Sequence, residues 1–349
     1  MKKGITIAGS LTVDIIKYID RYPDIQALTH ITGQVRSTGG LCANCALTLA
    51  RLDPALPLKA IALVGDDEAG DFVVSRFAAH PSIDISGLGQ AGDTSFTDVM
   101  TEQGTGRRTF FYYPGSNTLL GPGHFDFSRL ETDILHIGYI LVLEQLDAPD
   151  PDYPTALCRV LHAAQTAGIR TSIDVVSIAG GRYGELVPPA LRYTDYCCIN
   201  EYEAAAITGI SLREIDGGVI KQNLLLACRA LIEMGVARWA VIHMPEISCG
   251  LERNGAYVER DSWQLPPEFI KSSVGAGDAF AAGILYGAYQ GLDLSESLRI
   301  AGAVAAYSLG GAGASDAIVP LAELMEKMES LAEKSLLGHF KKGIDISQR

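Results

Sequence analysis

An acid follows two glycines at residues 275–278, where Gly275-Ala276-Gly277-Asp278 precedes a stretch of small apolar residues. Glycines adopt backbone angles closed to other residues, so successive N–H groups can converge at the start of a helix. Together with the helix dipole, such N–H groups favour a bound anion. A carboxylate beside bound phosphate would repel it, which makes chemical sense if Asp278 takes a proton from an attacking hydroxyl. The alternative is that Asp278 only caps the helix, because Asp is a preferred N-cap residue.

Two segments nearer the N-terminus carry polar residues and glycines at the ends of apolar runs. Asp14 follows a strand-like run, and its carboxylate could accept hydrogen bonds from adjacent sugar hydroxyls or serve as a turn residue. Gly39 and Gly40 precede a helical stretch and could bring backbone amides against a ligand. Asn44 would then face the same ligand one helical turn later.

Asn200 and Glu203 also stand where an apolar run gives way to a helix. An Asn followed three residues later by Glu is the pattern of a capping box. The same side chains could bind a ligand, because a helix N-terminus at the edge of a sheet can cap and bind at once.

Two adjacent arginines, Arg107 and Arg108, stand in a segment that alternates between apolar and polar residues. Either could contact a substrate or phosphate bidentately, although arginines on an exposed hairpin commonly lie over apolar surface. Of the two, Arg107 is our candidate for substrate binding.

Short apolar runs alternate with helical periodicity through most of the chain, which predicts repeated βαβ units. A doubly wound, mainly parallel α/β sheet with helices on both faces follows from this order. Ligands of such sheets bind at the carboxyl ends of the strands, where Asp14 is expected. The strand-like runs lie at residues 5–8, 59–64, 134–137, 171–176, 196–199 and 239–242.

Segments 14–37 and 95–114 break this rhythm, and the second reads as a β-hairpin across a Gly-containing turn. Their half-polar pattern suits a small β-sheet that could act as a lid over the active-site edge and exclude water. We therefore predict one domain, residues 1–349, that carries this small β-sheet lid.

Composition limits the classes of partner. The chain has 349 residues, of which 48% are hydrophobic, and a formal net charge of −13. Without a long basic run, it is not expected to bind nucleic acid or an anionic membrane as its main partner. Neither a signal sequence nor an 18-residue apolar span is apparent, so a cytoplasmic location is expected.

In this order the motifs resemble those of the ribokinase-like, or PfkB, family of carbohydrate and nucleoside kinases. The most specific match is Gly275-Ala276-Gly277-Asp278-Ala279-Phe280, and the diglycine followed by Asn44 and the Asn200-x-x-Glu203 motif also fit. The resemblance implies that Asp278 is the catalytic base and that Gly275, Ala276 and Gly277 form the anion hole for ATP. It assigns acceptor binding to Gly39, Gly40 and Asn44, supports Asp14 in that role, and places Mg²⁺ near Asn200 and Glu203, the latter acting through water.

This chain departs from the family pattern at three places. Ser272-Ser273-Val274 replaces the usual Asp-Thr-Thr and removes a carboxylate that helps many relatives bind a monovalent cation, which argues against potassium activation. His243-Met244-Pro245 replaces Thr-x-Gly near the nucleotide phosphates, and Pro245 cannot donate a backbone hydrogen bond. Gly302 stands where an Asn often lines the adenine pocket.

We therefore predict an ATP- and Mg²⁺-dependent kinase that phosphorylates a hydroxyl of a sugar or sugar-like molecule, and a homodimer formed through the lid. A nucleoside kinase, including a pseudouridine kinase, is the first alternative, and a sugar-binding sensor without turnover is the second. A dinucleotide-binding dehydrogenase is disfavoured because no Gly-x-Gly-x-x-Gly follows the first strand-like run.

Overall fold

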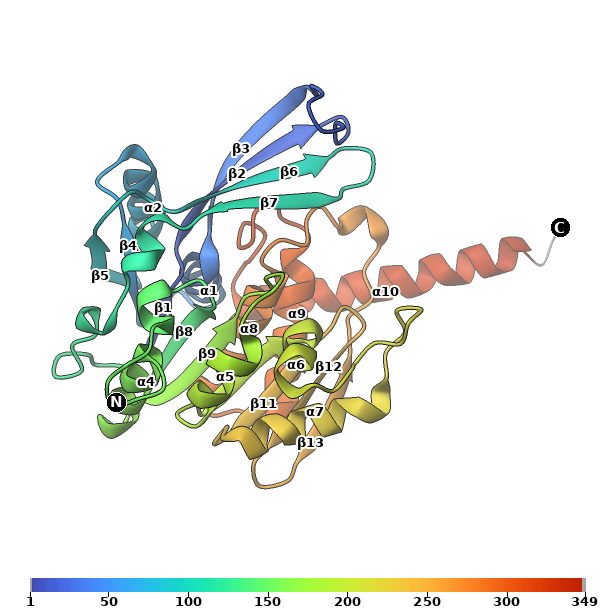
Figure 1. Ribbon diagram of the computed structural model, residues 1–349. Helices are drawn as coiled ribbons and strands as arrows, with labels where there is room; N and C mark the ends of the chain where they lie inside the picture. The colour runs from blue at the N-terminus through green and yellow to red at the C-terminus, as the bar shows by residue number, and fades with distance from the viewer. Residues whose placement is uncertain (1, 347–349) are drawn as a thin grey trace.

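A nine-stranded sheet forms the framework of the computed structural model, which describes residues 2–346 and the side chains of residues 2–333 (Figure 1). Its strand order is β13-β12-β11-β10-β9-β8-β1-β4-β5. All neighbours from β11 to β5 run parallel, whereas β12 and β13 add an antiparallel edge. The strands are β1 (Ile5–Gly9), β4 (Leu58–Val64), β5 (Ile83–Gln90), β8 (Ile134–Ile140), β9 (Arg170–Val175), β10 (Tyr196–Asn200), β11 (Trp239–His243), β12 (Ile247–Glu252) and β13 (Tyr257–Asp261).

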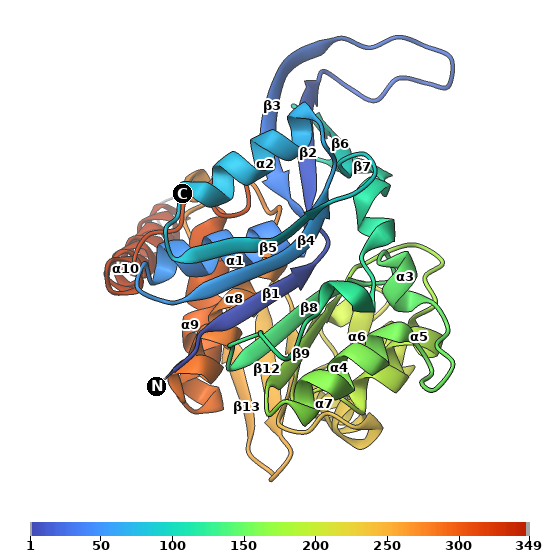
Figure 2. The ribbon, with the colours of Figure 1, turned by 90° about the vertical axis from the view of Figure 1, so that its left-hand side faces the viewer.

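Helices cover both faces of this sheet, as the alternation of strand and helix patterns predicts (Figure 2). One face carries α4 (Ala156–Thr166), α5 (Tyr183–Leu191), α6 (Glu201–Thr208) and α7 (Lys221–Met234). The other carries α1 (Gly40–Leu52), α2 (Glu68–Ala78), α8 (Ala276–Gln290) and α9 (Leu294–Ser308). The short α3 (Glu144–Asp147) follows β8, and α10 (Leu321–Ile346) packs against α9 before it extends away from the body.

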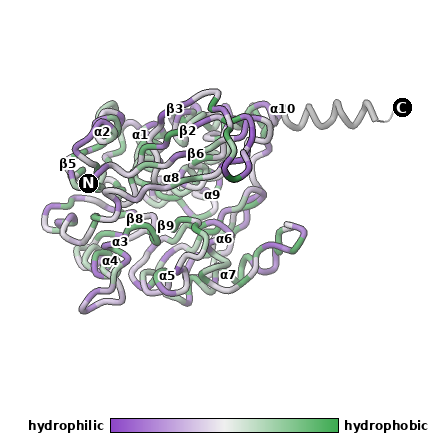
Figure 3. The backbone as a smooth tube through the Cα atoms, turned by 45° about the horizontal axis from the view of Figure 1, so that its top comes forward, coloured by the Kyte–Doolittle hydropathy of each residue, from purple (hydrophilic) through white to green (hydrophobic). Residues whose placement is uncertain are grey.

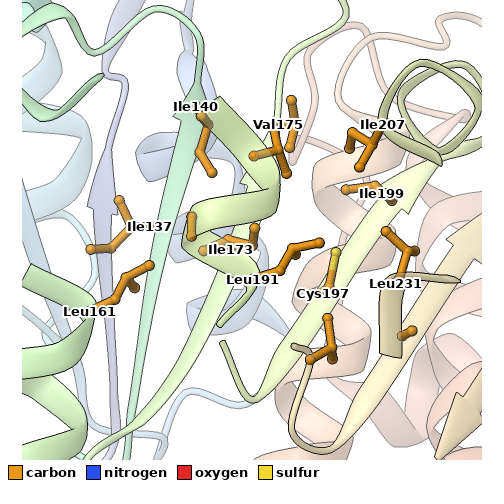
Figure 4. Close-up of a cluster of buried hydrophobic side chains, with 14 of the residues drawn as sticks. Ile137, Ile140, Leu161, Ile173, Val175, Leu191, Cys197, Ile199, Ile207 and Leu231 are labelled. Carbon is orange, nitrogen blue, oxygen red and sulfur yellow. The ribbon is translucent and has the colours of Figure 1, made fainter. Parts of the chain in front are cut away.

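Each face of the sheet buries its own hydrophobic core. Figure 4 shows part of the core under α4 to α7, where side chains of β8, β9 and β10 meet those of the helices. In Figure 3 hydrophobic residues gather in the central strands, and many peripheral loops are hydrophilic. Strands covered on both faces must be apolar throughout, which explains the short unbroken apolar runs of the sequence. None of the helices that the structure describes combines the length and apolar character needed to cross a bilayer.

A second sheet of four strands, in the order β3-β2-β6-β7, projects above the carboxyl edge of the large sheet (Figure 1). Its strands are β2 (Thr12–Ile19), β3 (Ile31–Gly39), β6 (Phe96–Glu102) and β7 (Arg108–Tyr113). Most of it comes from segments 14–37 and 95–114, whose alternating pattern predicts such a sheet. We call this second sheet the lid sheet, after its position.

Candidate active site

Asp278 lies in the first turn of α8 and is held by two side chains from other elements. Asn44 Nδ2 in α1 donates a hydrogen bond of 2.8 Å to Asp278 Oδ2. The Tyr139 hydroxyl in β8 lies 2.7 Å from both carboxylate oxygens. Burial raises the pKa of Asp278, while the hydrogen bonds from Tyr139 and Asn44 lower it in part. A fixed carboxylate with a raised pKa is suited to accept a proton.

The backbone before Asp278 forms the cradle that the glycines predict. Gly275 is the N-cap of α8, with φ of +73°, and no side chain caps the first turn of this helix. A Cβ at Gly275 would overlap Ala314, so only glycine fits both the angle and the space. The Ala276 N–H makes a long hydrogen bond of 3.4 Å to the Ser273 carbonyl, whereas the next N–H groups of α8 have no partner within the helix and are available to an anion.

The structure brings the predicted acceptor residues beside this carboxylate. Gly39 ends β3 opposite Thr12 of β2, and a Cβ at Gly39 would overlap the Asp14 carboxylate. Gly40 begins α1 with φ of +76°, which directs the helix so that Asn44 reaches Asp278.

Asp14 shares the electrostatic environment of Asp278. Burial raises the pKa of Asp14 to about 6, hydrogen bonds from Thr12 and Thr97 oppose the shift, and the charge of Asp278 adds to it. The charge of Asp278 is thus felt at Asp14, as expected of acids that belong to one site.

A family model agrees with this geometry over most of the chain. The model of the pfkB family of carbohydrate kinases matches residues 2–320. The chain belongs to the PfkB family. It is thus a carbohydrate kinase of the class that transfers phosphate to an alcohol, as the sequence motifs predict.

Individual PfkB relatives differ in their substrates. An ATP-dependent ribose-1-phosphate kinase of Halopiger xanaduensis is 29% identical over 317 residues, which are 89% of this chain and 93% of that protein. A nucleoside kinase of Methanocaldococcus jannaschii is 20% identical and spans 93% of this chain and 96% of its own length. The structure of Arabidopsis thaliana ribokinase with ribose and ATP superposes with a TM-score of 0.73 at 19% identity, covering 94% of this chain and 99% of that one. This likeness confirms the ribokinase-like fold.

In this PfkB protein, Asn200 and Glu203 form a complete capping box at the start of α6. The Glu203 N–H donates to Asn200 Oδ1 at 2.9 Å, and the Asn200 N–H donates to Glu203 Oε2 at 3.0 Å. Ser177 Oγ also donates to Glu203 Oε1 at 2.8 Å. Burial raises the pKa of Glu203 to about 7, and the charge of Asp278 contributes to this shift.

A fourth acid, Asp174 near the end of β9, belongs to the same buried acidic region. Burial raises its pKa well above the usual value, and the charges of Glu203 and Asp278 raise it further. Among the residues that the structure describes, no three His, Cys, Asp or Glu side chains gather into a ready metal cage. The oxygen donors here fit Mg²⁺, which keeps several waters and needs few direct protein ligands.

A cavity of about 970 Å³ opens on the other side of the cradle, and its size suits a nucleotide. Ala276 and Gly277 line it at the cradle, and His243, Trp263 and Gly302 line it farther out. His243 packs on the Phe280 ring with centroids 5.0 Å apart, and burial lowers its pKa to about 4. The ring of Trp263 lies beside Gly302, and a Cβ at that glycine would meet it only at ordinary van der Waals distance.

The two arginines of the hairpin occupy different environments. Arg107 lies exposed in the turn before β7, apart from the cradle. Arg108 is half-buried, and its Nη1 donates to Ser272 Oγ at 3.1 Å. The structure therefore brings Arg108, rather than Arg107, to the segment that leads into the cradle.

Three side chains at this site went unrecognised in the sequence: Tyr139, Ser177 and Trp263. A signal existed for Tyr139, because it lies near the carboxyl end of a buried strand. Ser177 follows β9 in the same way. For Trp263, which stands in an irregular segment, the sequence offers no periodic signal.

Proposed function

We propose that this chain is an ATP- and Mg²⁺-dependent kinase that phosphorylates a hydroxyl of a sugar or a sugar phosphate, with Asp278 as the general base. The observation that carries the proposal is the Asp278 carboxylate, held by Asn44 and Tyr139 at the mouth of the Gly275 cradle. Two further observations support it: the cavity of about 970 Å³ is lined by Ala276 and Gly277 of the cradle, and the charge of Asp278 is felt at Asp14.

In the proposed reaction, Asp278 takes the proton of the acceptor hydroxyl as its oxygen forms a bond to the γ-phosphorus of ATP. The bond from that phosphorus to the oxygen bridging to the β-phosphate breaks, and ADP leaves. The Gly275 to Gly277 amides hold the negative charge on the transferred group. Asp14, Gly39, Gly40 and Asn44 orient the acceptor, which lowers the entropic part of the barrier.

Asn200 and Glu203 are the residues that would hold Mg²⁺, with Glu203 acting through water. Bound magnesium supplies charge neutralisation to the phosphates. Potassium is not expected to be required, because Ser272-Ser273-Val274 lacks the carboxylate of many relatives. The chain's cytoplasmic location remains a prediction from the sequence.

A homodimer formed through the lid sheet is part of the proposal. The support is a set of large apolar side chains that the lid leaves exposed. They are Ile31, Val35, Phe110, Phe111, Tyr112 and Tyr113. A second copy would cover part of this surface, and light scattering that gives the mass of a monomer at working concentration would contradict it.

A nucleoside kinase is the second candidate, because the Methanocaldococcus jannaschii relative named a nucleoside kinase spans nearly the whole chain. A sensor without turnover is the third.

An ADP-release screen over pentoses, hexoses, sugar phosphates and nucleosides, with and without potassium, separates these three functions. We expect ADP release with a sugar or sugar phosphate, and release that is slower by about 100-fold or more with Asp278→Asn at the same protein concentration. Release only with nucleosides would select the second candidate, and binding of a sugar without release would select the third.

A further inference from the structure

Arg108 is a cation of the lid sheet held against the active-site segment. It begins β7, and its guanidinium reaches across to Ser272, which is only 5% exposed and stands three residues before Gly275. Burial lowers the pKa of Arg108, yet a guanidinium stays charged at any physiological pH. The lid thus carries a permanent positive charge to the side of the cradle.

Within residues 2–333, no acid lies within ion-pair distance of Arg108, and its one side-chain hydrogen bond goes to a neutral hydroxyl. Other arginines of the chain are paired: Arg36 with Glu68, and Arg159 with Asp150. A half-buried charge without a counter-ion is costly unless a ligand supplies the opposite charge. With five N–H donors in a planar fork, an arginine fits a phosphate group especially well.

Two phosphates could approach Arg108, one of the nucleotide and one of the acceptor, and the position of Arg108 favours the acceptor. The 970 Å³ cavity assigned to the nucleotide is lined by Ser273, Ala276 and Gly277, but neither Ser272 nor Arg108 lines it. Arg108 therefore lies outside that cavity, on the lid sheet that also carries Asp14.

The register of the lid sheet gives the distance between Arg108 and the row of residues that contains Asp14. Tyr112 pairs with Thr97, which pairs with Asp14, so these three residues form one row across the lid. Arg108 lies four residues from Tyr112 on the same face of β7, about 13 Å along the strand. Tyr112 faces the main sheet, because its hydroxyl accepts a hydrogen bond of 3.0 Å from Asn117 Nδ2, and Asn117 Oδ1 in turn accepts one from the Leu11 N–H just after β1. A phosphorylated pentose and the long arginine side chain can together bridge this distance.

We propose that Arg108 binds the phosphate group of the acceptor, so that this kinase phosphorylates a sugar phosphate in preference to the free sugar. This inference rests on the proposed function, because it assigns the acceptor class to the same site. The hydroxyl to be phosphorylated would lie at Asp278 and Asp14, and the phosphate already present would lie toward Arg108.

Ribose 1-phosphate and ribose form the matched pair of probes, because they differ by one phosphate and share the free primary hydroxyl. We expect kcat/KM to be at least tenfold higher for ribose 1-phosphate. Arg108→Gln should raise the KM for ribose 1-phosphate about 10- to 100-fold, the range for a lost charged hydrogen bond. The KM for ATP and the kcat/KM for ribose should change less than about twofold.

Arg108→Lys keeps the charge but loses the planar fork of N–H donors. Its KM for ribose 1-phosphate should lie between those of wild type and Arg108→Gln. Arg36→Gln is the matched control, since Arg36 belongs to the same lid sheet but pairs with Glu68 and stacks on Phe72. It should leave both KM values unchanged. Melting temperatures of all variants separate loss of folding from loss of binding.

Two results would overturn the inference: equal losses for ribose and ribose 1-phosphate in Arg108→Gln, or a rise in the KM for ATP instead of the acceptor KM. Calorimetric titration of the two sugars onto the Asp278→Asn protein supplies a test that needs no turnover. If wild type releases no ADP with any sugar or sugar phosphate of the screen, the proposed function fails. Even so, tighter binding of ribose 1-phosphate that is lost in the double variant with Arg108→Gln would support the role of Arg108, and equal binding of both sugars would refute it.

Discussion

Helices α6 and α8 both begin at the carboxyl edge of the large sheet, but their first turns are satisfied differently. At α6, Asn200 and Glu203 close a reciprocal capping box with their own backbone N–H groups. At α8, Gly275 takes the N-cap position and provides no side chain. A helix start that lacks a side-chain cap leaves its N–H groups to a ligand, whereas a capped start offers mainly the charge of its acid. The comparison supports the proposal that the anion binds at α8 and the cation at α6.

The acids around these two helix starts share one property, a raised pKa. Asp278, Glu203 and Asp174 are buried, and burial raises the pKa of each. Buried acids with perturbed pKa values cluster at functional sites, where such shifts serve catalysis and ligand binding. Their mutual repulsion is relieved when a cation binds, so ligand binding and the charge of the site are linked.

The largest expected effect comes from Asp278→Asn, which keeps the size of the side chain and its contact with Asn44 but removes the proton acceptor. We expect kcat to fall about 100-fold or more, the range of general-base catalysis, with acceptor KM within a few-fold of wild type. ADP release under saturating substrates measures this. A kcat near that of wild type would contradict the role of Asp278.

Gly275→Ala tests the uncapped start of α8. Alanine is strained at φ of +73°, and its Cβ would overlap Ala314, so we expect a loss of about 1–3 kcal/mol in stability and at least a tenfold loss in kcat. The matched control is Gly291→Ala at the other end of the same helix, where φ is +77° but no atom lies within 4 Å of the added Cβ. It should lower the melting temperature less and leave kcat unchanged. Equal effects of the two variants on kcat would show that the Gly275 backbone is not part of the site.

Glu203→Gln tests the capped start of α6. Gln also suits this position of a capping box, so the melting temperature should change little. The Mg²⁺ concentration for half-maximal activity should rise about tenfold, as for other residues that act on a metal through water. Since the pKa of Glu203 is raised to about 7, the wild-type requirement for Mg²⁺ should increase as pH falls below 7 and the carboxylate is protonated. The variant should lack this pH dependence, and an unchanged Mg²⁺ requirement would exclude Glu203 from the cation site.

Tyr139→Phe should have the smallest effect. The Tyr139 hydroxyl lowers the pKa of Asp278 by stabilising its ionised form, so its removal should raise that pKa. The base is active only when deprotonated, and the acidic limb of the kcat/KM profile should therefore move to higher pH, by less than about one unit. A pH profile identical to that of wild type would mean that Tyr139 does not act on the base.

Local patterns account for much of what the sequence predicts correctly. Repeated apolar runs and helical periods predict the doubly wound sheet, because short strands that are apolar throughout occur almost only in sheets covered by helices on both faces. The glycines before Asp278 and the pair Asn200 and Glu203 are also local, since each belongs to one helix start.

Contacts between distant segments could not be obtained in this way. The bond from Asn44 to Asp278 joins residues 234 apart, and only the resemblance to the PfkB family suggests that they share a site. The contact of Tyr139 with Asp278 depends on the direction that the pleat of β8 gives to the Tyr139 side chain. Arg107 and Arg108 differ by one position, and the start of β7 decides which of them faces the cradle, because successive side chains on a strand point to opposite faces.

A crystal structure with ribose 1-phosphate and a non-hydrolysable ATP analogue would test the central claim most directly. We expect the terminal phosphoryl group on the amides of Gly275 to Gly277 and the acceptor hydroxyl within hydrogen-bond reach of an Asp278 oxygen, about 2.6–3.2 Å. A nucleotide bound away from α8, or an acceptor whose hydroxyls all lie beyond reach of Asp278, would contradict the account.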